Sequence, residues 1–316
     1  MRRAARGGPG QFAERRERAE RLAETVSGAA RAPLEVQVAV LEHQLRRSAA
    51  VDPARPNGDG HLPLLDLDGA ATTVIGEVAT AIDALAGIGG EPLGEPTPCD
   101  SAFVSTAEQA KREMDVASGQ TYPRKSLVPE PLAESGAMLR SLGPSELAAV
   151  VETWLDDTSL VEPRLAFWIR VAASPVLEAG AAAATAPTGW TGAACPLCGG
   201  SAQASVIAEE SGEFMAGSPR SLVCGRCATW WSFPRVTCVA CGDDDSTHID
   251  SFLVDDQRWV RVDCCSSCRS YVKTFDLREK GSLGVVPLVD DVATSMLDVW
   301  AQHRGYSRPS LSFAGV

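Results

Sequence analysis

The chain has 316 residues, of which 45% are hydrophobic, and it carries a formal net charge of −12. This length allows two or three domains with cores of their own. The sequence has no continuous run of about 18 apolar residues, so we expect no membrane-spanning segment. The acidic balance disfavours nucleic acid as a partner, because nucleic-acid binding needs a basic surface. Arg2 and Arg3 precede charged residues and not an apolar segment, which predicts a cytoplasmic protein and not an exported one.

The first 187 residues carry helical patterns and no catalytic motif. Helices are predicted over 12–25 and from Pro33 to Arg47, and their apolar faces would pair as a helical hairpin. Pro163 opens a later helix, because proline is tolerated in the first helical turn, and the alanine-rich run 179–187 predicts a hinge. Between these patterns we expect helices over 72–86, 103–118, 130–142 and 145–156. We therefore predict a mostly helical domain over 1–187 that holds no phosphate-binding loop or nucleophile motif.

The cysteines dominate the region that follows. Nine of the ten lie between residues 195 and 268, and eight of these form four C-x-x-C pairs. The two-residue spacing lets both sulfurs of a tight turn reach one metal ion, so two pairs can complete a tetrahedral site. Four pairs therefore predict two four-cysteine sites for iron or zinc, since sulfur ligands suit both metals. The predicted ligands are Cys195, Cys198, Cys224, Cys227, Cys238, Cys241, Cys265 and Cys268.

The spacing leaves the grouping of these ligands open. We favour a sequential grouping, in which the first two pairs hold one ion and the last two hold the other, over an interleaved cross-brace. The intervals of 25 and 23 residues within the two groups leave room for a hairpin in each. We predict two rubredoxin-like or zinc-ribbon modules over 188–316, closed by a helix that Asp290 and Asp291 cap, and a C-terminal tail.

Three other side chains are candidates for chemistry. A lone cysteine such as Cys99 is usually an inert filler. Cys264 cannot easily share the turn of the fourth pair, which makes it a spare thiol near the site. His248 is expected at the surface, because eight cysteines already complete two tetrahedra.

The metal ions could be purely structural, or the sites could hold iron or bind metal loosely enough for the thiols to exchange. In the first case, they replace the hydrophobic core of ribbons that could not fold without them. Aromatic residues around the pairs are expected to shield the sulfurs from solvent: Trp230, Trp231, Phe233 and Trp259. Residues 188–285 carry nine Lys and Arg against twelve Asp and Glu, and each loaded site adds about −2, because four thiolates outweigh a divalent ion. This region is therefore anionic and a poor match for DNA or RNA.

The cysteine motifs, together with the residues around them, resemble the formate dehydrogenase accessory proteins of the FdhE type. The string from Cys224 to Cys241 includes Trp231, Arg235 and Val236. It is preceded by Cys195-Pro-x-Cys198-Gly199 and followed by Cys265-x-x-Cys268-x-x-Tyr271-x-Lys273. The similarity continues through Asp290-Asp291-x-Ala293 to Gly305-Tyr306-x-Arg308-x-Ser310, so it covers about residues 190–313.

The resemblance implies an assembly factor and not an enzyme. Such a factor is similar to rubredoxin in its metal sites, and it interacts in the cytoplasm with the catalytic subunit of formate dehydrogenase during maturation. Two other functions compete with this one. A rubredoxin-like electron carrier leaves the large helical half unexplained, and a zinc-ribbon nucleic-acid-binding factor conflicts with the acidic charge. The oligomeric state does not follow from the sequence.

Overall fold

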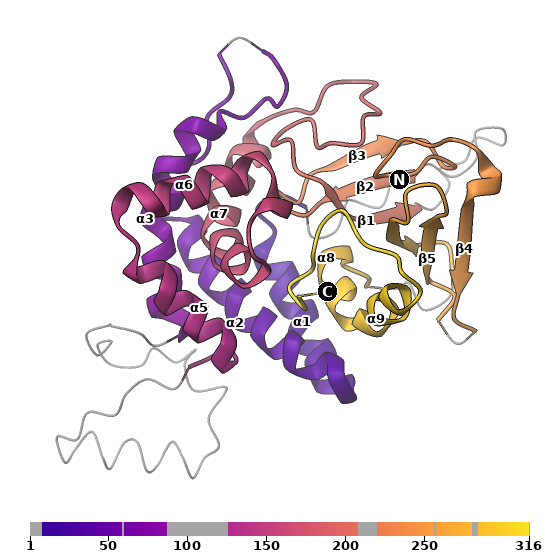
Figure 1. Cartoon of the computed structure of the whole chain (residues 1–316), viewed down its shortest axis with the longest axis horizontal. Helices are drawn as coiled ribbons and strands as arrows, with labels where there is room; N and C mark the ends of the chain where they lie inside the picture. The colour runs from indigo at the N-terminus through magenta and orange to yellow at the C-terminus, as the bar shows by residue number, and fades with distance from the viewer. Residues whose placement is uncertain are drawn as a thin grey trace.

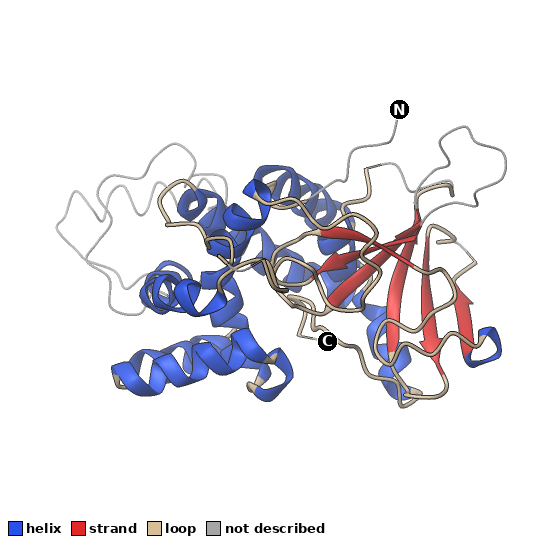
Figure 2. Cartoon of the chain, turned by 90° about the horizontal axis from the view of Figure 1, so that it is seen from above, coloured by secondary structure: helices blue, strands red, loops and turns tan. Residues whose placement is uncertain are grey.

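A computed structural model describes residues 8–58, 60–86, 126–207, 220–255, 257–279 and 284–315. Helices gather on one side of the molecule and a twisted sheet forms the other, with the last helices beside the sheet (Figure 1, Figure 2). The mostly helical first part and the strand-rich second part confirm the predicted fold class. The predicted helix 103–118 and Cys99 lie outside the described residues.

The helical part closely follows the predicted pattern. Its helices are α1 (Phe12–Thr25), α2 (Arg31–Ser48), α3 (Leu67–Ala86), α5 (Glu130–Ser141), α6 (Pro144–Asp156) and α7 (Pro163–Ala183). Helices α1 and α2 pack against each other as the expected hairpin. Pro163 opens α7, where the Glu162 carboxylate accepts hydrogen bonds from the first free N–H groups. The hinge predicted over 179–187 begins too early, because helix α7 continues to Ala183.

Helices α3 and α7 form the centre of the largest hydrophobic core. Both are long and apolar enough to cross a membrane, but 78% of the apolar stretch of α7 and half of that of α3 are buried inside the fold. Trp168 and Ile169 of α7 are fully buried in this core, as is Ile82 of α3. The burial indicates that these two apolar helices are core helices.

The second part of the chain builds one six-stranded sheet in the order β3-β2-β1-β6-β5-β4. The strands are β1 (Ala202–Ile207), β2 (Arg220–Cys224), β3 (Trp230–Phe233), β4 (Ile249–Leu253), β5 (Val260–Cys265) and β6 (Tyr271–Asp276). Strands β1, β2 and β3 form one antiparallel ribbon, and strands β4, β5 and β6 form a second one. Strands β1 and β6 pair in parallel and join the two ribbons, so the two predicted modules share one sheet.

The chain ends in two helices, α8 (Pro287–Ala293) and α9 (Ser295–His303). The prediction that Asp290 and Asp291 cap the final helix is wrong: both lie within α8 and are fully buried. Cations from distant segments pair with them there. The guanidinium of Arg18 binds the Asp290 carboxylate at 2.5 Å, and the ammonium of Lys273 binds that of Asp291 at 2.8 Å.

A buried ionic network fastens these helices to the sheet. The Lys273 ammonium on β6 lies 2.8 Å from Asp291 and 2.6 Å from Asp298. The Arg308 guanidinium binds the same two carboxylates at 3.1 and 2.8 Å, and the Tyr271 hydroxyl donates a hydrogen bond to Asp298 at 2.8 Å. Two cations thus balance two carboxylates, which lowers the cost of burying each charge.

Removing the buried cation should expose this cost. We expect Lys273→Met to lower the free energy of unfolding by about 3–5 kcal/mol, because it leaves two buried carboxylates with one cation. Denaturant unfolding followed by circular dichroism measures the change. Arg31→Met, which removes an exposed ion pair with Glu35, is the control and should cost less than about 0.5 kcal/mol. Equal stability of the two variants would contradict the role of the network.

Candidate metal sites

The eight paired cysteines form two clusters of four. The sulfurs of Cys195, Cys198, Cys224 and Cys227 lie within 4.8 Å of one another, and so do those of Cys238, Cys241, Cys265 and Cys268. This is the sequential grouping. Within each cluster, sulfurs that belong to different C-x-x-C pairs lie 3.4 to 3.9 Å apart. A tetrahedral ion with bonds of about 2.3 Å to sulfur needs sulfurs about 3.8 Å apart, so each cluster could hold one metal ion.

The same backbone turn recurs at all four C-x-x-C pairs. The residue after each second cysteine has a positive φ: 69° at Gly199, 57° at Ala228, 77° at Gly242 and 59° at Arg269. Glycine adopts this left-handed conformation freely, whereas Ala and Arg do so at a cost. The turns also aim amides at the sulfurs, and the Arg226 N–H donates to the sulfur of Cys224 at 3.3 Å. Four equivalent turns therefore build the clusters.

The first cluster lies inside the core of the helical part. All four of its cysteines are buried and belong to the same hydrophobic cluster as Val74 of α3 and Trp168 of α7. That core runs across the boundary expected between residues 187 and 188, and the division into two domains stays a prediction. An ion in this cluster would have no contact with bulk solvent and would brace helices and sheet together.

A short segment before helix α3, at Leu64 and Leu65, supports the first cluster. The N–H groups of Leu64 and Leu65 donate hydrogen bonds to the carbonyl oxygens of Pro196 and Leu197, at 3.0 and 2.9 Å. These two acceptors are the middle residues of the first C-x-x-C pair. The sequence offered only a Pro-Leu-Leu-Asp string here, and nothing in its pattern pointed to a contact about 130 residues away. Sequence reasoning therefore missed this backing loop.

Two buried arginines surround the first cluster. The Arg226 guanidinium donates to the carbonyl oxygens of Trp154 and Leu155 at the end of α6, at 3.0 and 2.6 Å. Burial lowers the pKa of Arg170 to about 10, and negative charge at Asp291 and Cys224 opposes the shift. Arg170 thus stays cationic at neutral pH. The two guanidinium groups offset part of the charge that a loaded four-cysteine site carries, about −2.

The second cluster reaches the surface. Cys241 is exposed and Cys268 is half-buried, whereas Cys238 and Cys265 are buried. Burial acts to raise the pKa of Cys268, but hydrogen bonds with Ser270 and with the neighbouring thiols of Cys241 and Cys238 together outweigh it and lower that pKa to about 7. Burial raises the pKa of Cys238 to about 12. The two clusters therefore have the same four-cysteine composition and the same turn geometry but differ in their access to solvent.

A polar bridge ties the two turns of the second cluster together. The Asp243 carboxylate accepts a hydrogen bond from the Ser267 hydroxyl and lies 2.8 Å from Nδ1 of His248. His248 is exposed, as predicted. Its ring contacts the carboxylate that follows the third pair, so it supports the site from outside the sulfur cluster.

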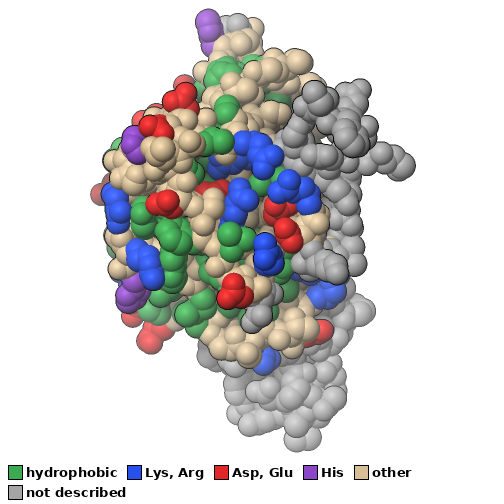
Figure 3. Space-filling model, turned by 90° about the vertical axis from the view of Figure 1, so that its right-hand side faces the viewer, with side chains coloured by type: hydrophobic (Ala, Val, Ile, Leu, Met, Phe, Trp, Pro, Cys, Tyr) green, Lys and Arg blue, Asp and Glu red, His purple; other side chains and the backbone are tan. Residues whose placement is uncertain are grey.

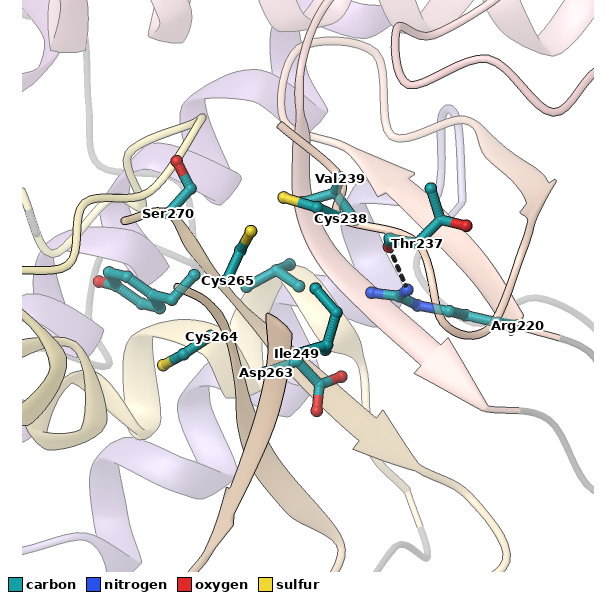
Figure 4. A pocket seen from close by; sticks show the side chains of 11 residues that line it. Arg220, Thr237, Cys238, Val239, Ile249, Asp263, Cys264, Cys265 and Ser270 are labelled. Carbon is teal, nitrogen blue, oxygen red and sulfur yellow. Dashed lines mark hydrogen bonds between the residues drawn. The ribbon is translucent and has the colours of Figure 1, made fainter. Parts of the chain in front are cut away.

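Cys264 faces away from the second cluster. Figure 4 shows its sulfur pointing in the opposite direction to that of its neighbour Cys265, because neighbouring residues of a strand alternate between the two faces of a sheet. It packs in a buried group with Val262 and Ala301, and burial raises its pKa to about 12. The adjoining cavity of about 10 Å³ has room for about one water molecule. Cys264 is thus a packed core thiol.

The aromatic residues expected to shield the sulfurs divide between two places. Trp231 and Phe233 are buried in the core that contains the first cluster. Trp230 and Trp259 instead pack in a separate group around β1 and β6, where Trp259 stacks on Phe275. Arg220 performs a related task for the second cluster. Its guanidinium donates to the carbonyl oxygen of Thr237 at 3.0 Å, just before Cys238 (Figure 4).

Comparison with known proteins shows which sequences this chain is similar to. A family model described as the C-terminal domain of FdhE matches residues 236–314. An FdhE homologue from Aquifex aeolicus is 29% identical over 199 residues, which are 61% of this chain and 68% of that protein. An FdhE homologue from Shewanella oneidensis is 35% identical over 118 residues, and this match spans only 37% of either protein.

A solved structure extends the similarity to the whole fold. The crystal structure of FdhE from Pseudomonas aeruginosa superposes with a TM-score of 0.63 and covers 98% of this chain and 97% of that one. The two sequences are 18% identical, so this match concerns the fold alone. The chain is therefore similar to FdhE proteins, by sequence in its C-terminal region and by fold over nearly its whole length, which confirms the resemblance predicted from its cysteine motifs.

Proposed function

We propose that this protein is an accessory factor for the assembly of formate dehydrogenase and acts in the cytoplasm without being an enzyme itself. It would bind the immature catalytic subunit through its cysteine-rich half. The observation that carries the proposal is the pair of four-cysteine clusters within an FdhE-like fold. The similarity to FdhE homologues supports the link to formate dehydrogenase.

The eight paired cysteines are the metal ligands in this proposal, and iron or zinc is the metal. Four thiolates in a tetrahedron suit either ion. The first ion would act structurally, because its ligands are buried between helices and sheet. The second would lie where a partner can approach it, because Cys241 is exposed. The working face of the protein is therefore the side that carries the second cluster.

A rubredoxin-like electron carrier is a second candidate function. The exposure of Cys241 favours it, since electron transfer needs a metal site close to the surface. Metal identity separates the two functions: iron with thiolate-to-iron absorption would permit redox chemistry, whereas zinc has no redox chemistry of its own. A colourless protein with two zinc ions would exclude the carrier and leave the assembly factor.

The two sites should release metal at different rates. A chelator such as 4-(2-pyridylazo)resorcinol is expected to remove one ion per chain at least about tenfold faster than the other, because only the second cluster is open to solvent. The two phases of the absorbance change measure the rates. A single phase for both ions would contradict the difference in burial.

Paired substitutions assign the two phases. Cys238→Ala/Cys241→Ala should retain one ion and lose the fast phase, with the helical circular dichroism preserved. Cys195→Ala/Cys198→Ala removes two ligands from the core and should give an unfolded or aggregated protein, because structural metal binding contributes about 10–16 kcal/mol in small zinc domains. Two ions bound to the first variant would show that the ligand grouping is wrong.

The maturation role makes a prediction in the cell. Deletion of the gene should abolish formate dehydrogenase activity in its host, and the wild-type chain supplied from a plasmid should restore it. Cys238→Ala/Cys241→Ala should fail to restore activity although it accumulates to the wild-type level on an immunoblot. Full formate dehydrogenase activity in the deletion strain would reject the proposed function.

A further inference from the structure

The outer strand of the sheet and the end of α9 form an exposed surface next to the second cluster. We call it the β4–α9 surface and define it by Phe252, Arg269, Met296, Trp300, Arg304 and Tyr306. The Phe252 and Trp300 rings lie 4.9 Å apart between centroids and join the strand to the helix. Figure 3 faces this side of the molecule, where Lys and Arg side chains lie next to hydrophobic ones.

Two exposed arginines on this surface rest on aromatic rings. The Arg304 guanidinium lies 4.1 Å from the centroid of Trp300, and that of Arg269 lies 3.9 Å from the centroid of Tyr306. Within the described part of the chain, neither has a carboxylate oxygen within 4.0 Å. In a protein with a net charge of −12, these two cations remain available to a carboxylate from outside.

Apolar side chains are exposed beside the arginines. Strand β4 lies at the edge of the sheet, and its Phe252 and Leu253 are 38% and 53% exposed; Val254 follows at 38%. Met296, one helical turn before Trp300, is 58% exposed. Natural proteins usually protect an edge strand with charges or a covering element. Strand β4 also carries the exposed Asp250, so its apolar part is the end formed by Phe252 and Leu253. An exposed apolar stretch with Arg and Trp nearby is typical of a binding surface.

The surface is held in place before any partner arrives. The Arg269 side chain donates a hydrogen bond to the carbonyl oxygen of Arg304, and the Arg269 carbonyl oxygen accepts one from the Ser307 N–H at 2.8 Å. Arg269 also directly follows the cluster ligand Cys268. A segment bound here would therefore lie beside the second four-cysteine cluster.

We propose that the β4–α9 surface docks an extended acidic segment of the partner protein, which would add to the edge of β4 and place its carboxylates on Arg269 and Arg304. This inference rests on the proposed function and names the contact surface for that partner. Edge-strand addition supplies backbone hydrogen bonds, and the flanking side chains select the sequence. Nucleic acid is a poorer occupant, because the ribbons carry more acidic than basic residues and phosphate chains need a broad basic surface.

The test uses the full-length, metal-loaded protein and three labelled peptides of equal length, in which Leu alternates with Glu, Gln or Lys. Fluorescence anisotropy should show binding of the Glu peptide, weaker binding of the Gln peptide and none of the Lys peptide. Added salt should weaken the binding of the Glu peptide, because exposed charge pairs are screened. Equal binding of all three peptides, or displacement of the Glu peptide by a single-stranded oligonucleotide at similar concentration, would overturn the proposal.

Charge reversal locates the binding site. Arg304→Glu should weaken binding of the Glu peptide at least about tenfold, and Arg304→Gln by less. Arg55→Glu changes the net charge equally at an exposed arginine of the helical half and should leave binding unchanged. Circular dichroism and metal content confirm that each variant is folded. Unchanged affinity in Arg304→Glu would place the peptide elsewhere and reject the surface.

Copurification with the catalytic subunit of formate dehydrogenase separates the two proposals. Capture by the wild-type protein and loss of capture by Arg304→Glu would support both. Equal capture by both proteins would reject the surface and leave the proposed function standing. Peptide binding that depends on Arg304, without capture of the subunit, would reject formate dehydrogenase as the partner and retain the docking surface for another acidic protein.

Discussion

Placement of the first four-cysteine cluster inside the helical core is the constraint on which the rest of the structure depends. Its sulfurs share a hydrophobic cluster with side chains of α3, α6 and α7, and the backbone of Leu64 and Leu65 hydrogen-bonds to its first turn. A metal-binding ribbon is usually a small unit that stands alone. Here the ribbon forms one wall of the core, so metal binding and the packing of the helices would be coupled.

The two ribbons have the same local design and different surroundings. Each repeats the C-x-x-C turn with a left-handed residue after it, and the parallel pairing of β1 with β6 joins them into one sheet. The first ribbon packs against the helices, whereas the second ends in the edge strand β4. The same four-cysteine arrangement therefore occurs once as a buried cluster and once as a cluster that reaches the surface.

Features that depend on a few neighbouring residues were predicted well, whereas contacts between distant segments of the chain were not. The C-x-x-C pairs indicated the sulfur clusters, and apolar periodicity predicted helices such as α1 and α6. Asp290 and Asp291 had the usual form of a helix cap, but tertiary contacts with Arg18, Lys273 and Arg308 bury them inside α8. The role of Arg226 was equally hidden, because its partners at the end of α6 lie about 70 residues away.

The sequence by itself determined which eight cysteines form clusters, the number of clusters and the largely helical first half, because each depends on spacing or periodicity within a short stretch of chain. Only the tertiary structure decided that the sulfurs group sequentially, that one cluster is buried while Cys241 of the other is exposed, and that the Arg269 side chain contacts the end of α9 at Arg304. Those features depend on which distant segments pack together, and burial and charge pairing are properties of that packing.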